Sequence, residues 1–148
     1  MSETAYGVPQ PVADGPYAGW MTWGLGADPF ETANGPFHLR READGSVTAG
    51  FLAETRHLNA GGMIHGGALM TFADFALFAH ALDALEGKPG VTVAFNGEFV
   101  GAGVAGAVVT SVGEVVRNTR SLIFARGTLY QNDAVIFAWT GIIKKMKG

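Results

Sequence analysis

The sequence contains no cysteine at all. This absence excludes disulfide bonds, thiolate nucleophiles and zinc sites built from cysteine. The other metal-binding side chains are scattered: His38, His57 and His80 have no helical or hairpin spacing to carboxylates, so we predict no metal site. The chain also lacks the G-x-G-x-x-G signature of a dinucleotide site, and we predict that it needs no cofactor.

Charge is scarce as well. Charged residues make up only 16% of the 148 residues, whereas hydrophobic residues make up 48%. A monomer normally covers its surface with more charge than this, so we expect part of the surface to be buried between subunits. The formal net charge is −3, and no run of lysine or arginine is longer than two residues. A nucleic-acid partner is therefore not expected.

No long hydrophobic run is uninterrupted. The longest apolar segment, residues 66–85, contains Asp74, His80 and Asp83, which argues against a membrane span. The first residues, MSETAYGVPQPVADGPY, show no basic region followed by an apolar stretch, so no signal peptide is expected. We therefore predict a soluble, cytoplasmic protein with no membrane partner.

Proline is concentrated at one end of the chain, with five of the six prolines in the first 36 residues. We expect residues 1–35 to form an irregular lead-in that packs across the domain through its aromatic side chains. At most a short helical piece is expected there, near residues 20–25. The domain proper is predicted to span residues 36–148.

One long helix is predicted over residues 65–87, HGGALMTFADFALFAHALDALEG. The segment is rich in alanine, leucine, methionine and phenylalanine, and Pro89 follows its end. Its apolar residues surround the helix axis, so burial on most sides is expected. Runs typical of strands lie on both sides of the helix, at residues 36–42, 47–57, 91–100, 105–118, 121–131 and 134–146. Short connections predict antiparallel neighbours, and hence an α+β fold in which a curved sheet of about six strands wraps around one helix.

Asp74 is the sharpest chemical feature of the predicted helix, because Phe72 and Phe75 flank it. A carboxylate in apolar surroundings is costly unless it is hydrogen-bonded or protonated. Such an environment raises the pKa of a carboxyl group and suits a general base or a nucleophile. The alternative is that Asp74 faces the edge of a cleft or caps a neighbouring loop.

A glycine-rich segment, NAGGMIHGG, leads directly into the helix. The first N–H groups of a helix have no internal acceptor, so those of Gly66 and Gly67 could bind an oxyanion. Glycine also allows a substrate carbonyl to approach the backbone closely. The alternative is a flexible turn in which His65 caps the helix.

Together these residues resemble the hotdog-fold thioesterases of the phenylacetate-pathway (PaaI-like) type. That family has an Asn, a His-Gly-Gly six residues later, and an Asp nine residues after the His; Asn59, His65-Gly66-Gly67 and Asp74 have this spacing. The resemblance covers residues 36–146. It implies the hotdog fold, an acyl-CoA substrate, a homodimer or homotetramer, and an active site between two subunits.

The resemblance also implies roles for individual residues. The Gly66 N–H would polarise the thioester carbonyl, and Asn59 of the same subunit would position that carbonyl or the attacking water. Asp74 of the facing subunit would act as general base or nucleophile. Thr92 matches a Ser or Thr that hydrogen-bonds near the water, and His65 either fixes the loop or takes part in catalysis.

Arg117 and Arg120 align loosely with basic positions that contact the nucleotide phosphates of CoA. Relatives commonly have glycine where this chain has Thr119, so the turn between the two arginines departs from the family pattern. The alternative is that both arginines are simply solvated charges.

Two other functions stay open at this point. The same fold supports hydration or dehydration of acyl thioesters, with an Asp or Glu and a His at other spacings, and it supports binding of acyl-CoA without catalysis. A His at the helix start followed by two glycines favours hydrolysis. The acyl group, whether aryl, short-chain or medium-chain, depends on a pocket depth that these motifs leave open.

Overall fold

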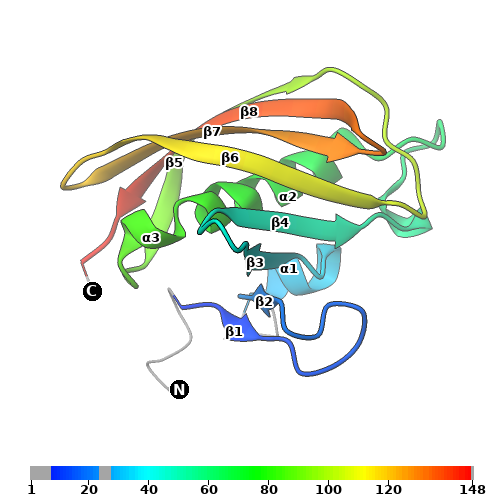
Figure 1. The fold of residues 1–148 in the computed structure, drawn as a ribbon. Helices are drawn as coiled ribbons and strands as arrows, with labels where there is room; N and C mark the ends of the chain where they lie inside the picture. Colours follow the sequence, from blue (N-terminus) through cyan, green and yellow to red (C-terminus); the bar gives the residue numbers. More distant parts are fainter. Residues whose placement is uncertain (1–7, 24–27, 148) are drawn as a thin grey trace.

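The computed structural model describes residues 8–23 and 28–147. An antiparallel sheet curves around the long helix α2 (Gly66–His80), as Figure 1 shows. The sheet has eight strands in the order β1-β2-β3-β4-β6-β7-β8-β5. The α+β hotdog fold is thereby confirmed. The strands are β1 (Gln10–Pro11), β2 (Met21–Thr22), β3 (His38–Arg41), β4 (Val47–Leu52), β5 (Gly90–Phe99), β6 (Val108–Asn118), β7 (Leu122–Gln131) and β8 (Ala134–Lys145).

The six long strands correspond to the predicted ones, except that β4 ends at Leu52 and the last residues of its predicted run form the 3-10 helix η1 (Thr55–His57). The lead-in adds the two-residue strands β1 and β2. The helical piece expected near residues 20–25 was wrong, because Met21 and Thr22 form β2 and residues 24–27 lie outside the described part. The helix of the lead-in is α1 (Pro29–Asn34). It begins where Asp28 accepts a hydrogen bond from the Glu31 N–H and proline occupies the first turn, which favours a helix start.

The predicted long helix is divided in two. Helix α2 ends at His80, and a short helix α3 (Leu82–Leu85) follows after Ala81, whose φ of −91° and ψ of 6° interrupt the regular geometry. No proline or glycine marks this break, so it was not visible in the sequence. The segment stops as predicted before Pro89, with Glu86 and Gly87 both in the left-handed region.

The core lies between α2 and the concave face of the sheet. Phe72 of α2 packs against Phe51 of β4 and Phe37, with ring centroids 4.7 and 5.4 Å apart. One stripe of α2 stays outside this core: Gly67 and Asp74 are exposed, and Thr71 is half-buried between them. Residues at this spacing share one side of a helix, so the described residues leave that side of α2 open.

The lead-in packs against the same domain. The Trp20 ring lies on Gly50 of β4, and the Arg40 guanidinium lies 4.3 Å from the centre of that ring. Tyr17 stacks on His38 at 3.8 Å. These contacts cover the convex face of β3 and β4.

At the other end of the sheet, β5 is bonded only to β8 among the described strands. Its free edge is ten residues long and exposes apolar side chains, including Val93 and Phe99. Exposed edges of this kind invite pairing with another chain. Within residues 8–23 and 28–147, no helix combines the length and apolar character needed to cross a bilayer.

Candidate active site

Asp74 lies on the open side of α2 and is held by one hydrogen bond. The Thr92 hydroxyl donates to Asp74 Oδ1 at 2.6 Å. Thr92 sits near the start of β5 opposite Ile143, a core residue, so its side chain faces α2. A shift in register between Thr92 and Ala94 marks a β-bulge, a device that re-aims side chains. Helix and strand together therefore orient this carboxylate.

The surroundings of Asp74 alter its acidity. Desolvation by neighbouring protein atoms raises the pKa of Asp74 above its ordinary value, the Thr92 hydrogen bond lowers it, and the negative charge of Asp28 raises it again. The net shift is upward. Although Asp74 reaches the surface of the single chain, its carboxylate is partly enclosed, and a raised pKa makes the ionised form a better proton acceptor.

The start of α2 offers one free N–H group. His65 caps the helix: its Nδ1 accepts from the Gly67 N–H at 2.8 Å, and its carbonyl accepts from the Ala68 N–H at 2.9 Å. The Gly66 N–H has no acceptor among the described residues. Of the two predicted oxyanion donors, Gly67 is thus already engaged within the chain, and Gly66 remains available at the positive end of the helix.

Asn59 organises the loop before the helix. Its Oδ1 accepts from the N–H groups of Gly61 and Met63 at 2.9 and 3.2 Å, and its own N–H donates to the Met63 carbonyl. A bridge between Leu58 and Ile64 closes the loop. The oxygen of the Asn59 amide is therefore used internally, and only its Nδ2 is left to contact a substrate.

The candidate residues do not converge within one chain. Gly66 and Asp74 are eight residues apart on α2, which corresponds to about 12 Å along the axis at roughly 1.5 Å per residue. A water activated by Asp74 must come within about 3–3.5 Å of a carbonyl carbon to attack it. A carbonyl bound at Gly66 is therefore out of reach of Asp74 in the same chain.

Arg117 and Arg120 lie at the β6–β7 turn and are exposed. Neither arginine side chain has a hydrogen bond or ion pair to another described residue. Thr119, which departs from the family pattern, closes the turn itself: its N–H donates to the Leu122 carbonyl at 2.8 Å, and its hydroxyl accepts from the Leu122 N–H at 2.9 Å.

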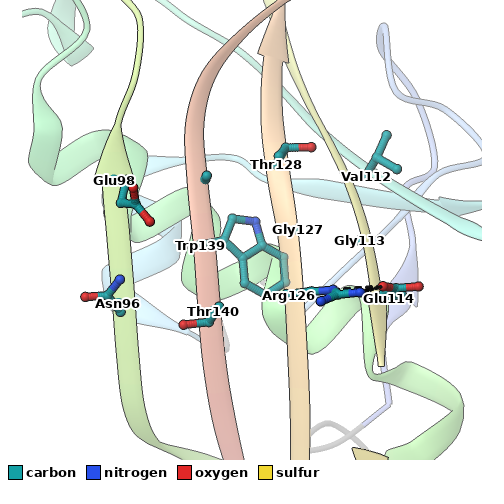
Figure 2. Close-up of a pocket in the computed structure, with 11 residues that line it drawn as sticks. Asn96, Glu98, Val112, Gly113, Glu114, Arg126, Gly127, Thr128, Trp139 and Thr140 are labelled. Atoms are coloured by element: carbon teal, nitrogen blue, oxygen red, sulfur yellow. Dashed lines mark hydrogen bonds and ion pairs between the residues drawn. The ribbon is translucent and has the colours of Figure 1, made fainter. Parts of the chain in front are cut away.

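A hollow of about 410 Å³ lies on the convex face of the sheet (Figure 2). It contains the ion pair between Arg126 and Glu114, at 2.8 Å. The side chain of Trp139, a residue of β8, faces the opposite, concave side of the sheet, where its ring stacks on His80 of α2. Since Asp74 belongs to the α2 side, this hollow is separate from the candidate site.

A second pocket, of about 420 Å³, adjoins Asp74 and was not foreseen. Its walls come from α1 with its cap and from α2: Asp28, Phe30, Glu31, Met70, Thr71 and Asp74. Burial, and then the charges of Asp28 and Asp74, raise the pKa of Glu31 to about 8. The sequence signal was the Asp-Pro pair ahead of Glu31, which marks a helix start.

Among the described residues, the His, Asp and Glu side chains, including those that line this pocket, form no group suited to hold a metal ion.

The family model of the thioesterase superfamily matches residues 61–138. The chain belongs to the thioesterase superfamily. The matched residues include His65, Gly66, Asp74 and Thr92. Helix α1, with Glu31, lies outside the matched region.

One curated relative and two solved structures are similar to this chain. The Pseudomonas aeruginosa protein PA0474, whose name assigns it provisionally to the esterases, is 28% identical over 109 residues, 73% of this chain and 81% of its own. A mutant of the phenylacetic acid degradation protein PaaI from Thermus thermophilus is 25% identical, with a TM-score of 0.67 over 80% of this chain and 100% of its own. BH2602 from Bacillus halodurans, solved with CoA, is 21% identical, with a TM-score of 0.74 over 84% of this chain and 82% of its own. The resemblance to PaaI-like thioesterases is thereby confirmed.

Proposed function

We propose that this thioesterase hydrolyses acyl-CoA to a free acid and CoA, with Asp74 as the catalytic carboxylate. The observation that carries the proposal is the Asp74–Thr92 pair: a partly enclosed carboxylate of raised pKa, oriented by a 2.6 Å hydrogen bond and open to a substrate. The CoA in the Bacillus halodurans relative supports CoA as the leaving group.

In the proposed reaction the thioester carbonyl oxygen accepts a hydrogen bond from the Gly66 N–H of one subunit. Asp74 of the facing subunit removes a proton from water, and the water oxygen attacks the carbonyl carbon. The N–H and the helix dipole stabilise the tetrahedral oxyanion. The carbon–sulfur bond then breaks, and the CoA sulfur takes the proton held by Asp74. Direct attack by the Asp74 carboxylate, followed by hydrolysis of the anhydride, gives the same products.

The proposed site requires a homodimer, which could assemble further into a homotetramer. The separation of Gly66 and Asp74 along α2, the open side of that helix and the free edge of β5 all support this assembly. Two-fold symmetry would then place two identical sites at the interface.

The remaining residues take supporting roles in this proposal. The free Nδ2 of Asn59 would orient the carbonyl or the water, while His65 acts as a helix cap and takes no direct part in catalysis. Arg117 and Arg120, exposed and without partners in the described part of the chain, would contact the CoA phosphates.

The test is release of free thiol from a panel of acyl-CoAs by the wild-type protein and by Asp74→Asn. We expect turnover by the wild type and a loss of about a hundredfold or more in kcat for the variant. Circular dichroism should show an unchanged fold, because Asn can still accept the Thr92 hydrogen bond. Near wild-type turnover by the folded variant would refute the role of Asp74. Binding without thiol release by the wild type would indicate a non-catalytic binder, and hydration of an enoyl-CoA without thiol release would indicate a hydratase.

A further inference from the structure

The pocket between α1 and α2 begins at the proposed catalytic carboxylate. Asp74 forms one wall of it, and Glu31 and Phe30 of α1 form another. If Asp74 activates water next to the thioester carbonyl, the chain attached to that carbonyl needs space beside Asp74. A volume of about 420 Å³ can hold a short or medium acyl chain.

Helix α1 is fastened to the domain and forms a fixed wall. Arg56 donates from its guanidinium to the carbonyls of Ala33, at 2.9 Å, and of Gly35. His57 Nδ1 accepts from the Glu54 N–H, so its Nε2 carries a proton and donates to the Asn34 carbonyl at 2.6 Å. The other end of α1 is capped by Asp28. A wall fastened to the domain at its C-terminal end can discriminate between substrates.

The chemistry of this wall is acidic and apolar. Three of its six lining residues carry carboxyl groups, and none is basic. Arg56, the cation in the described contacts to α1, and the His57 ring are both engaged with carbonyls at the C-terminal end of that helix. Phe30, 64% exposed, and Met70 supply apolar surface. An acyl group that ends in a carboxylate would find repulsion and no counter-ion here.

One carboxyl oxygen of Glu31, Oε2, is buried without a hydrogen-bond partner in the described part of the chain. Buried polar atoms without partners are uncommon and mark places where a ligand or water binds.

We propose that the pocket between α1 and α2 binds the acyl group, and that Glu31 is a specificity-determining residue that favours uncharged acyl groups over those ending in a carboxylate. This inference rests on the proposed thioesterase function. Helix α1 lies outside the region matched by the superfamily, so the preference belongs to this chain's own lead-in.

Protonation of Glu31 makes the preference depend on pH. The raised pKa of Glu31, about 8, keeps its carboxyl protonated near neutrality, and ionisation at higher pH adds a negative charge beside Asp74. The groups that face Glu31 are Asp28 on its own element and Asp74 on α2. Discrimination against an anionic acyl group should therefore increase from pH 6 to pH 9.

The experiment compares kcat/KM for butyryl-CoA and succinyl-CoA, which have equal numbers of carbons and share the CoA moiety. We expect the wild type to prefer butyryl-CoA, and Glu31→Arg to reduce that preference by about tenfold or more by supplying a counter-ion. Asp14→Arg, which makes the same change in charge at an exposed site of the lead-in, should leave the ratio unchanged. Glu31→Gln, which removes only the ionisation of this side chain, should make the ratio of the two kcat/KM values independent of pH between 6 and 9.

The outcomes separate the two claims. If the wild type hydrolyses both substrates but neither Glu31 variant changes the ratio or its pH dependence, the specificity role is wrong and the proposed function stands. If Glu31→Arg does not fold, the pH profile of Glu31→Gln alone decides. If the wild type releases no thiol from any acyl-CoA, the proposed function and this inference both fail.

Discussion

Asp74 illustrates how neighbouring residues set the chemistry of one carboxyl group. Desolvation and Asp28 raise its pKa, while the Thr92 hydroxyl opposes them by hydrogen-bonding the ionised form. The carboxylate is thus a stronger base than an exposed aspartate. The proposed rate should fall as the pH drops through the raised pKa of Asp74, because only the ionised form accepts a proton from water.

Replacing Thr92 should shift the acidic limb of the pH–rate profile, which is the pH range in which the rate falls as Asp74 becomes protonated. Thr92→Val keeps the shape of the side chain and removes the hydrogen bond that lowers the pKa of Asp74, so the limb should shift to higher pH. Thr92→Ser retains a hydroxyl and should leave the limb near its wild-type position. The measurement is kcat between pH 4 and pH 9 for the three proteins. An identical limb in wild type and Thr92→Val would show that this hydrogen bond does not control the catalytic group.

Among the elements, the start of α2 combines a cap with an N–H group that has no acceptor in the described part of the chain. His65 occupies the Gly67 N–H, so the preceding N–H of Gly66 is the one left for a substrate. In the proposed site, the His65 cap therefore determines which glycine N–H can bind the carbonyl oxygen. His65 itself does not contact the reacting atoms.

Removal of the cap should affect stability more than catalysis. His65→Ala should lower the free energy of unfolding by about 0.5–2 kcal/mol, as loss of a helix cap does, while His65→Asn should retain most of it. Urea unfolding measures both variants. A cap role also predicts that His65→Asn keeps kcat within about tenfold of wild type, whereas loss of a proton-transfer residue costs about a hundredfold or more. A hundredfold loss in the folded Asn variant would assign His65 a direct part in the reaction.

Elements with strong periodicity could be predicted from the sequence, and those set by tertiary contacts could not. The central helix and the six long strands follow from apolar patterning and from Pro89 as a stop signal. The interruption at Ala81 has no local marker. Helix α1 was missed because its six residues are too few for a periodic pattern, and contacts from Arg56 and His57 hold it in place.

The candidate site shows the same division. The spacing of Asn59, Gly66 and Asp74 was readable along the chain, as was the match of Thr92 to the family. The use of the Asn59 oxygen inside its own loop and the placement of Glu31 beside Asp74 depend on folding. Residues 31 and 74 are far apart in sequence, and only the packing of α1 on α2 brings them together.

For the molecule as a whole, residues 8–23 and 28–147 of a single chain leave two surfaces uncovered. The free edge of β5 exposes Val93, and the open side of α2 carries Asp74. Both lie where a second copy could complete the sheet and the site. The low overall charge of the chain fits burial of part of this surface.

The protein should therefore be at least a dimer in solution. Sedimentation at several concentrations should show no active monomer, and activity should fall on dilution together with the dimer. Val93→Lys, which places a charge on the free edge of β5, should favour dissociation, whereas Asp14→Lys at an exposed site of the lead-in should not. A stable and active monomer of 15.5 kDa would contradict a shared site.

The shared site itself can be tested with two variants that each remove one function. Gly66→Pro removes the N–H and should keep the helix start, because proline is favoured at the first position of a helix and His65, with ψ of 136°, has the extended backbone that precedes proline. An added side chain there would meet the exposed Phe99 ring, so Gly66→Ala, which keeps the N–H and meets the same ring, is the matched control. Gly66→Pro and Asp74→Asn should each be inactive, and Gly66→Ala should retain activity.

The activity of mixed dimers of Gly66→Pro and Asp74→Asn chains is the sharpest test that each site is shared between two subunits. If each site takes Gly66 from one subunit and Asp74 from the other, a mixed dimer has one intact site and one site with both defects. Random reassociation makes about half of the dimers mixed, so refolding the two inactive proteins together should recover about a quarter of wild-type activity. If mass spectrometry confirms the mixed dimers and the mixture stays as inactive as either parent, Gly66 and Asp74 do not act across the interface and the proposed site is wrong.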